Sequence, residues 1–249
     1  MKRLFKIESP KNDLKPFLKL FNRYKPLKKL IKKNSIIFDV GCNVGDTIAE
    51  FQHIFKCKKI YGFEPQIDCV EKLKARFKNK KNIEIYNYAL DHKIHKKDFY
   101  FHKYGDVYSG FYKINLKSKD HIDLKNRKRL KSNLIKYQKN INKKIVLNTL
   151  TLDHFIKKKQ IKRINLLKLD TQGSEHRILQ GAKKNLKNID VIITEIQFWD
   201  YYSQKNSFYN IEKIIRKHFE LYDISYVAKN PENFRTDYID VIYVNKNLK

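Results

Sequence analysis

The sequence predicts an α/β protein built on an open, mostly parallel sheet. Short, continuous apolar runs recur along the chain, and such runs are typical of strands that are buried on both faces. Helical segments separate most of these runs, as strand–helix–strand units require. Several runs end in an acidic residue, which places these acids together at the carboxyl edge of the sheet. The 249 residues are enough for one large domain of this kind.

The strand–turn–helix unit over residues 35–55 organises the rest of the prediction. Its apolar run ends at Asp39, and Gly41 and Gly45 then let the backbone turn sharply and approach a ligand closely. The free N–H groups of the following helix point back at this turn. A unit of this type holds nucleotide-like cofactors; a tight turn without a ligand is the alternative.

The residues of the turn indicate which cofactor it holds. A dinucleotide-binding turn needs glycine where this chain has Asn43 and Asp46, and the Gly-Lys-Ser/Thr ending of a phosphate loop is absent. An acid at the end of the strand suits a ligand with an ammonium group, and S-adenosylmethionine carries both an ammonium and a sulfonium. We therefore predict S-adenosylmethionine as the cofactor. The predicted contacts in this unit are Asp39, Gly41, Asn43, Gly45, Asp46 and Thr47.

The next two strands supply candidates for the nucleoside. The second strand ends at Glu64, one strand–helix–strand unit after Asp39, where an acid can accept both ribose hydroxyls. The alternative role of Glu64 is to cap the helix that follows. The third strand ends near Tyr88 and Ala89, which we expect to border the adenine.

Later in the chain, a fourth strand ends at Asp170 and a fifth contains Glu195. An acid inside such an apolar run is costly to bury without a partner. Ser174 is expected to cap a helix over residues 175–186, with Glu175 in its favoured first turn. Glu175 is therefore either a capping charge or a member of the site.

The remaining elements follow in a regular order. The last two strands have no helix between them and should be antiparallel neighbours. Thr151 is expected to cap the helix at 151–156. The predicted strands span residues 59–65, 83–88, 97–103, 145–150, 164–170, 189–196, 221–227 and 238–244, and the predicted helices span 47–55, 67–77, 151–156, 175–186 and 208–218.

Two segments fall outside this alternation. Residues 1–34 show apolar positions on one helical face with lysines between them, which predicts a basic amphipathic helix. This helix either packs over its own domain, residues 35–249, or makes peripheral contact with an anionic membrane. Residues 104–144 are rich in lysine and are predicted to be an insertion with a helix around 120–137. The insertion is a lid, a substrate surface or a solvated ornament.

The composition is strongly basic, with 55 Lys and Arg against 26 Asp and Glu and a formal net charge of +29. Such a charge attracts nucleic acids and anionic membranes. However, 46 of the 55 are lysine and they are spread along the whole chain, whereas sites that grip phosphates favour the planar fork of arginine. We therefore expect compositional bias and no specific nucleic acid.

The cysteines and the apolar runs bear on the compartment. Cys42, Cys57 and Cys69 are odd in number and lie in apolar runs, which favours a reducing compartment over disulfides or a zinc site. No run has the length of a membrane span, and the first residues lack the apolar stretch of a signal peptide. These features predict a cytoplasmic protein.

These motifs resemble those of the class I S-adenosylmethionine-dependent methyltransferases and, within them, the FkbM family. Residues 39–46 are similar to the family's cofactor loop, and residues 62–65 to its second motif. The most diagnostic stretch, residues 167–182, resembles the family pattern of Lys, apolar, Asp, two residues, Gly, any, Glu, ending in Leu, any, Gly, Ala. Residues 149–153 and Glu195 also stand where the family has them. Nothing can be carried over to the insertion.

The resemblance implies a Rossmann-like class I methyltransferase fold. Its sheet would have seven strands, mostly parallel with an antiparallel last strand, and helices on both faces. The resemblance also implies methyl transfer to a hydroxyl of a sugar, a polyketide or a lipid-linked saccharide. The fourth strand lacks the Asn/Asp-Pro-Pro-aromatic ending of base amino methylation, and no Pro-Cys nucleophile is present.

Removal of the hydroxyl proton needs a general base. Asp170 is the first candidate, Glu175 and Glu195 follow, and His154 and His176 are nearby alternatives. Several carboxylates in one pocket would either raise the pKa of one of them or bind magnesium. The rival hypotheses are an RNA methyltransferase or RNA-binding protein, a dinucleotide-dependent oxidoreductase and a binding module without activity.

Overall fold

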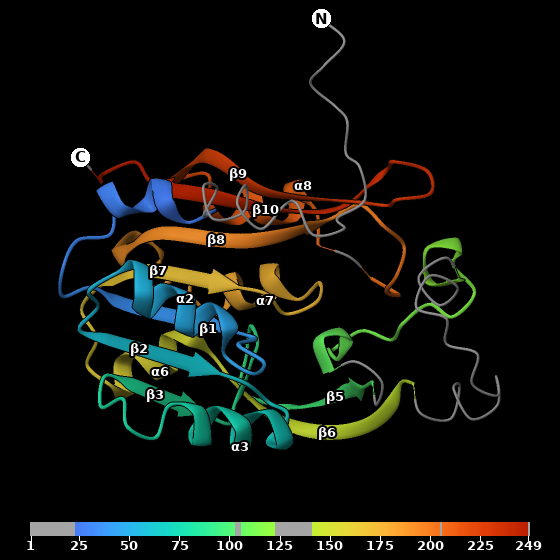
Figure 1. Cartoon of the computed structure of the whole chain (residues 1–249), viewed down its shortest axis with the longest axis horizontal. Coiled ribbons are helices and arrows are strands. Elements are labelled where there is room, and N and C mark those ends of the chain that lie inside the picture. The colour runs from blue at the N-terminus through green and yellow to red at the C-terminus, as the bar shows by residue number, and fades with distance from the viewer. Residues whose placement is uncertain (1–22, 103–105, 123–140, 205, 249) are drawn as a thin grey trace, which may run out of the picture.

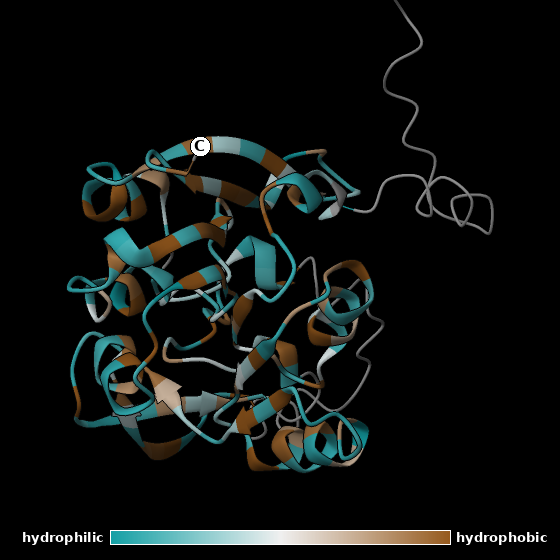
Figure 2. Ribbon diagram, turned by 90° about the vertical axis from the view of Figure 1, so that its left-hand side faces the viewer, coloured by the Kyte–Doolittle hydropathy of each residue, from teal (hydrophilic) through white to brown (hydrophobic). Residues whose placement is uncertain are grey.

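The computed structural model describes residues 23–102, 106–122, 141–204 and 206–248. Within this part of the chain, a seven-stranded sheet forms the centre of the molecule, and a three-stranded sheet flanks the carboxyl end of β3 (Figure 1). Figure 2 shows hydrophobic residues on the strands of this sheet, and nearly all residues of β1, β7 and β8 are buried, as in strands covered on both faces. The predicted α/β class is confirmed.

The central sheet has the order β3-β2-β1-β7-β8-β10-β9. Its strands from β3 to β8 pair in parallel, whereas β10 is antiparallel to both of its neighbours, β8 and β9. The predicted sheet with an antiparallel last strand is therefore confirmed. In sheet order the strands span Ile83–Tyr86, Lys59–Phe63, Ile36–Val40, Ile164–Leu169, Ile189–Gln197, Thr236–Asn245 and Phe219–Lys229.

Helices cover both faces of this sheet. One face is covered by α2 and α3, which place Phe51 and Leu73 in a buried apolar cluster. The other face is covered by α6, α7 and α8, which contribute Phe155, Leu179 and Ile211 to a second cluster. Each such side chain contributes about 1.5–3 kcal/mol when fully buried. The helices span Asp46–Ile54 (α2), Ile67–Arg76 (α3), Leu152–Lys158 (α6), Glu175–Gln180 (α7) and Phe208–Ile215 (α8).

The three-stranded sheet was not predicted. Its strands β5 (Lys96–Phe101) and β6 (Lys143–Leu150) are antiparallel, and β4 (Ala89–Leu90) adds to β6 in parallel. The two longer strands agree with the apolar runs, but nothing in the sequence indicates that they pair with each other across the insertion. The 3-10 helix η2 (Asp106–Tyr108) follows β5 and leads the chain back over the carboxyl ends of the central strands.

Helix α7 ends at Gln180, six residues before the predicted end. Gly181 lies against β4, where an added Cβ would approach the carbonyl oxygen of Asp91 to 2.3 Å. The carbonyl of Gly181 accepts a hydrogen bond from the backbone of Asp153 instead of continuing the helix. The chain then proceeds through turns to the short 3-10 helix η3 (Leu186–Asn188).

The predicted N-terminal helix and insertion are described only in part. Residues 1–22, 103–105 and 123–140 lie outside the described residues, and most of the predicted helix at 120–137 is among them. Just before β1, the 3-10 helix η1 (Lys25–Lys29) is flanked by Tyr24 and Ile31, which are buried on the α2 face of the sheet. Among the described residues, no helix is long and apolar enough to cross a membrane.

Candidate functional site

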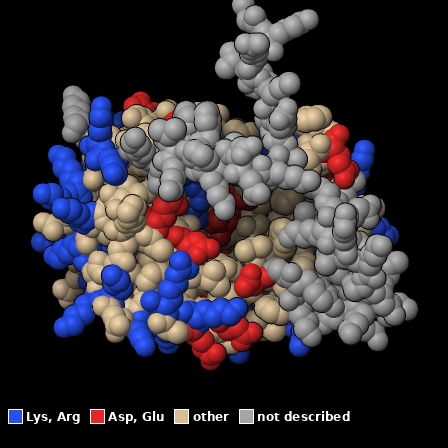
Figure 3. All heavy atoms as spheres, in the orientation of Figure 1, with Lys and Arg blue, Asp and Glu red and all other residues tan. Residues whose placement is uncertain are grey.

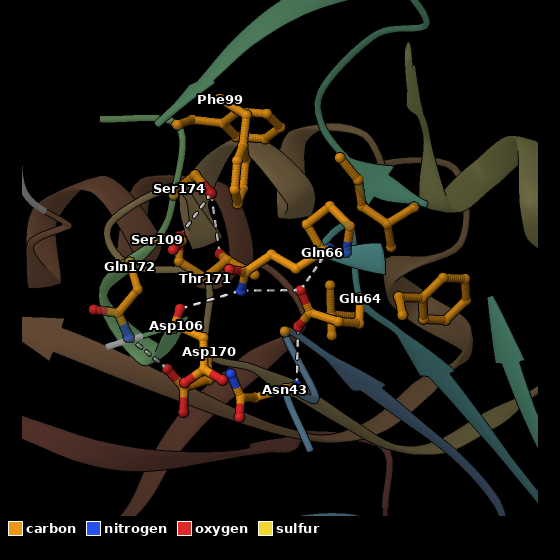
Figure 4. Close-up of a pocket in the computed structure, with 18 of the residues that line it drawn as sticks. Asn43, Glu64, Gln66, Phe99, Asp106, Ser109, Asp170, Thr171, Gln172 and Ser174 are labelled. Atoms are coloured by element: carbon orange, nitrogen blue, oxygen red, sulfur yellow. Dashed lines mark hydrogen bonds between the residues drawn. The ribbon is translucent and has the colours of Figure 1, made fainter. Parts of the chain in front are cut away.

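An open cavity of about 670 Å³ lies at the carboxyl ends of β1, β2 and β7 (Figure 4). Six separate segments of the chain form its wall, so the fold is needed to build it. The lining residues are Val40, Gly41, Asn43, Phe63, Glu64, Pro65, Gln66, Tyr88, Ala89, Leu90, Phe99, Asp106, Val107, Ser109, Gly110, Phe111, Asp170, Thr171, Gln172 and Ser174.

The turn after β1 forms one end of the cavity. Gly41 has a φ of +80°, and a Cβ at this position would lie 1.9 Å from the carbonyl oxygen of Asp170. Glycine therefore allows the turns after β1 and β7 to touch. Asn43 also adopts a positive φ, and its backbone N–H donates to Glu64 Oε2 at 2.9 Å. This bond fixes the turn to the end of β2.

Glu64 is held in place from both sides. Its Oε1 accepts hydrogen bonds from the backbone N–H (2.9 Å) and the side-chain amide (3.3 Å) of Gln66. Burial raises the pKa of Glu64 to about 7, against the opposing effect of the hydrogen bonds from Gln66 and Asn43. A carboxylate has about four acceptor positions, and three of them are already used, so Oε2 keeps one position for a hydroxyl of a ligand.

Asp170 presents its carboxylate at the cavity wall. Lys168 Nζ donates to Oδ2 and Gln172 Nε2 donates to Oδ1, each at 3.0 Å. The side chain of Asp170 is 38% exposed, whereas that of Lys168 is 5% exposed. Burial disfavours the charge on Lys168, but Asp170 and Asp39 outweigh this effect and raise the pKa of the lysine. The lysine therefore remains charged and orients the carboxylate.

Asp39 and Glu195 lie behind this wall, outside the cavity lining. Asp39 is fully buried, with Lys168 Nζ at 3.9 Å, and burial raises the pKa of its carboxyl to about 6. Glu195 accepts a hydrogen bond from Gln197 Nε2 at 2.8 Å. In the antiparallel register of β8 and β10, it stands opposite Asp240. Burial, followed by the charge of Asp170, raises the pKa of Glu195 well above its ordinary value.

Glu175 braces the turn that carries Asp170. Its Oε1 accepts hydrogen bonds from the backbone N–H groups of Thr171 (2.7 Å) and Gly173 (3.3 Å), and the side chain is fully buried. Burial raises the pKa of Glu175 to about 7. Ser174 is the N-cap residue of α7, as predicted, but its hydroxyl donates to Thr171 and makes no cap bond to the helix.

The structure brings six of the predicted site residues to the cavity wall. The four other predicted cofactor contacts do not line the cavity: Asp39 is behind it, and Gly45, Asp46 and Thr47 are at the start of α2. Asp46 instead forms an exposed ion pair with Arg76 at 2.6 Å. His154 and His176 are also absent from the lining. The six at the wall are Gly41, Asn43, Glu64, Tyr88, Ala89 and Asp170.

The side chains with metal-ligand spacing are not the carboxylates predicted to bind magnesium. Within the described ranges, the one group of side chains with metal-ligand spacing is Asp91, His92 and His95, outside the cavity. There, Arg177 and Lys97 already donate to the Asp91 carboxylate, at 2.7 and 3.1 Å. These two cations oppose the binding of a metal ion, so Asp91 is best described as the centre of an ion-pair network.

Sequence reasoning missed the part of the wall that comes from β5 and the insertion. Phe99, Val107 and Phe111 supply apolar surface there, and Asp106 supplies a carboxylate. The loop after η2 comes close to the β7 turn because it carries Gly110, whose Cβ would lie 3.2 Å from that of Gln172. A glycine between aromatic residues was the only signal in this stretch.

Comparison with known families identifies residues 39–221 as a methyltransferase FkbM domain. The chain belongs to the FkbM methyltransferase domain family. The match confirms the family predicted from residues 39–46, 62–65 and 167–182, and it supports the predicted S-adenosylmethionine-dependent class. No curated protein matches the sequence.

Solved structures provide further similarities. An FkbM methyltransferase from Methylobacillus flagellatus is 12% identical with a TM-score of 0.48; the alignment covers 85% of this chain and 43% of that one, so this chain spans less than half its length. An rRNA methylase from Streptococcus thermophilus is 14% identical (TM-score 0.45, covering 88% and 91%). TrmK from M. capricolum, in complex with S-adenosyl-homocysteine, is 16% identical (TM-score 0.45, covering 91% and 68%).

Proposed function

We propose that this protein transfers the methyl group of S-adenosylmethionine to a hydroxyl of an uncharged small molecule or glycan. The cavity would hold the cofactor with its ribose on Glu64 and its methionine part near Gly41, Asn43 and Asp170. Val107 and other apolar residues of the wall would enclose the adenine. The free cysteines support the further proposal of a reducing, cytoplasmic location.

The donor and acceptor groups of the cavity support this cofactor. Glu64 has a remaining acceptor position on Oε2 for a ribose hydroxyl, and the carboxylates of Asp106 and Asp170 favour the ammonium and sulfonium charges. The aromatic rings of Phe99, Phe111 and Tyr88 at the other side suit a flat base. A pyrophosphate would face the same carboxylates, which speaks against a dinucleotide.

The observation that carries the proposal is the exposed, oriented carboxylate of Asp170. The bound cofactor supplies an already activated methyl group, so the protein has to align the acceptor and remove one proton. Asp170 accepts the proton of the acceptor hydroxyl while the acceptor oxygen attacks the methyl carbon. The cofactor would supply this carbon from its sulfonium, so the carbon–sulfur bond would break with its electron pair left on sulfur as a neutral thioether.

The charge around the cavity favours an uncharged acceptor over RNA. Acidic side chains lie in the central hollow and along its left and lower sides in Figure 3, whereas the lysines and arginines drawn there lie mainly toward the edge of the described surface. A phosphodiester backbone is bound by matching cations, and acids at the entrance would repel it. The high overall positive charge is the one feature that favours an RNA acceptor, and it is not gathered at the site.

Transfer from radiolabelled S-adenosylmethionine tests the proposal. Neutral oligosaccharides, lipid-linked saccharides, polyketide alcohols and transcribed RNAs are offered as separate acceptors. We expect the label in a hydroxyl compound as an ether that resists mild alkaline hydrolysis. Label that enters only RNA, or only alkali-labile esters, would contradict the proposal.

A further inference from the structure

A second, more polar groove lies next to the cavity, and the residues that line it are outside the family motifs described above. It encloses about 880 Å³ of open space between the insertion, the segment after β8 and the tip of the β9–β10 hairpin. Two acids and two bases line it, so its formal charges cancel. The lining residues are Asn115, Ser118, Lys119, Asp120, Asp200, Tyr202, Ser203, Asn233 and Arg235.

A chain of hydrogen bonds connects this groove to the proposed base. Tyr202, which lines the groove, donates its hydroxyl to Gln172 Oε1 at 2.7 Å. Gln172 lines the cavity, and its Nε2 donates to Asp170 Oδ1 at 3.0 Å. The groove and the cavity are therefore separated at this point by two side chains.

The walls of the groove are fixed by ion pairs and backbone bonds. Arg235 NH2 donates to both oxygens of Asp120, at 2.9 and 2.8 Å, and the backbone N–H of Asp200 donates to Asp120 Oδ2 at 2.6 Å. The buried Asp120 thus ties the insertion to the hairpin and to the segment after β8. Ser203 adds a backbone bond to the carbonyl of Lys113. A groove braced in this way can present its polar groups in fixed positions.

Aromatic side chains of the segment after β8 pack together beside the groove. Trp199 and Tyr201 stack with ring centroids 4.7 Å apart, and Tyr202 packs edge-on against Tyr201 at 5.0 Å. These rings are buried with Ile114 from the insertion in one apolar cluster. The described part of the insertion is therefore an integral wall of the groove.

We propose that this groove binds the acceptor and that the acceptor is a neutral saccharide. The inference rests on the proposed function, since it takes Asp170 as the base that the acceptor must reach. The amides and hydroxyls of Asn115, Ser118 and Asn233 can both donate to and accept from sugar hydroxyls. With its cations balanced by Asp120 and Asp200, the groove has no surplus charge for a phosphate or a carboxylate. A saccharide seated there would present a hydroxyl to the cavity past Gln172.

Binding of defined oligosaccharides tests the assignment. Maltotriose, cellotriose and triacetylchitotriose are each mixed with the full chain in the presence of S-adenosylhomocysteine, and binding is measured by saturation-transfer NMR and titration. Asn233→Trp fills the groove from an exposed position, and Asn247→Trp is the matched control at an exposed site outside it. Affinity for S-adenosylhomocysteine is measured by calorimetry for every variant.

We expect at least one oligosaccharide to bind the wild-type chain, with tenfold or greater weakening in Asn233→Trp and no change in Asn247→Trp. S-adenosylhomocysteine should bind all three proteins equally. An oligosaccharide that binds both variants alike would overturn the location, and the absence of binding by all three sugars would overturn the saccharide class. In both cases the titration with S-adenosylhomocysteine still tests the proposed function separately. Failure of S-adenosylhomocysteine to bind the wild-type chain would contradict the proposed function instead.

Discussion

At the scale of single residues, Asp170 differs from the acids around it in its exposure to the cavity. Asp39 and Glu195 are buried and do not reach the cavity, whereas Asp170 is exposed on its wall and fixed by Lys168 and Gln172. From the sequence, Asp170 is the first candidate for the general base, and it stands at the end of a predicted strand. The sequence could not show that the neighbouring acids point into the protein interior, since alternation along a strand does not say which face meets a ligand.

Asp170→Asn tests this role. The amide keeps the size of the side chain but cannot accept the acceptor's proton, so we expect the turnover number to fall by about 10²–10⁴-fold. Affinity for S-adenosylhomocysteine, measured by calorimetry, should fall much less than the turnover number, because Glu64 and Asp106 still contact the ligand. Asp98→Asn is the matched control and should retain activity, because Asp98 is a partly exposed acid on β5 that pairs with Lys144 of β6. Full turnover in Asp170→Asn would exclude Asp170 as the base.

At the scale of elements, the turn between β7 and α7 depends on the buried carboxyl of Glu175. The pKa of this group is raised to about 7 from an ordinary value of 4.5, so the folded protein binds its proton more tightly than the unfolded chain. This contribution to the free energy of unfolding is therefore largest below pH 4.5 and is lost as the pH rises to about 7.

Glu175→Gln removes the titration while keeping an acceptor for the N–H groups of Thr171 and Gly173. Between pH 5 and pH 7.5 we expect the wild-type chain to lose about 1–3 kcal/mol more stability than this variant. Urea unfolding at each pH measures the difference, and Glu232→Gln, at an exposed acid, is the control. Parallel pH profiles for wild type and Glu175→Gln would show that the carboxyl does not titrate in this range.

The ion-pair network around Asp91 joins β4 and β5 to α7. Asp91 is fully buried, accepts two hydrogen bonds from Arg177 and one from His95, and these bonds hold its pKa well below the ordinary range despite burial. Its contribution to stability is present above the ordinary pKa of an aspartate and is lost at more acidic pH.

Arg177→Ala should lower the free energy of unfolding by about 1–3 kcal/mol, because it removes two charge-assisted bonds from a buried carboxylate. Arg177→Lys should cost less, since it keeps the charge and loses only the paired geometry. The measurement is the urea midpoint at constant m-value, with the exposed Arg216→Ala as control. A midpoint for Arg177→Ala equal to that of the control would mean that Lys97 and the two histidines suffice.

At the scale of the whole molecule, the main sheet was predictable and the second sheet was not. Continuous apolar runs and the glycine turn at Gly41 indicate buried parallel strands from local sequence alone. The pairing of β5 with β6 joins segments on either side of the insertion, and no local pattern records it. The cavity wall at Val107 and Phe111 and the polar groove depend on this pairing. They therefore became visible only in the folded structure.

The overall charge leads to a prediction about nucleic acids. With a formal charge of +29, we expect the protein to bind unrelated RNAs with similar affinity and to release them steeply as salt rises from about 50 to 200 mM. Fluorescence anisotropy with several labelled RNAs measures this dependence. An RNA that stays bound at the higher salt and accepts the labelled methyl group would instead favour an RNA methyltransferase.

The central claim, that the cavity holds S-adenosylmethionine with its ribose on Glu64, is tested most directly by calorimetric titration with S-adenosylhomocysteine. We expect binding at one site, unaffected by excess NAD. Glu64→Ala should weaken it about 10–100-fold through the loss of charge-assisted bonds, whereas Glu71→Ala, at an exposed acid on α3, should not change it. Equal affinity in Glu64→Ala and wild type, or displacement by NAD, would contradict the account.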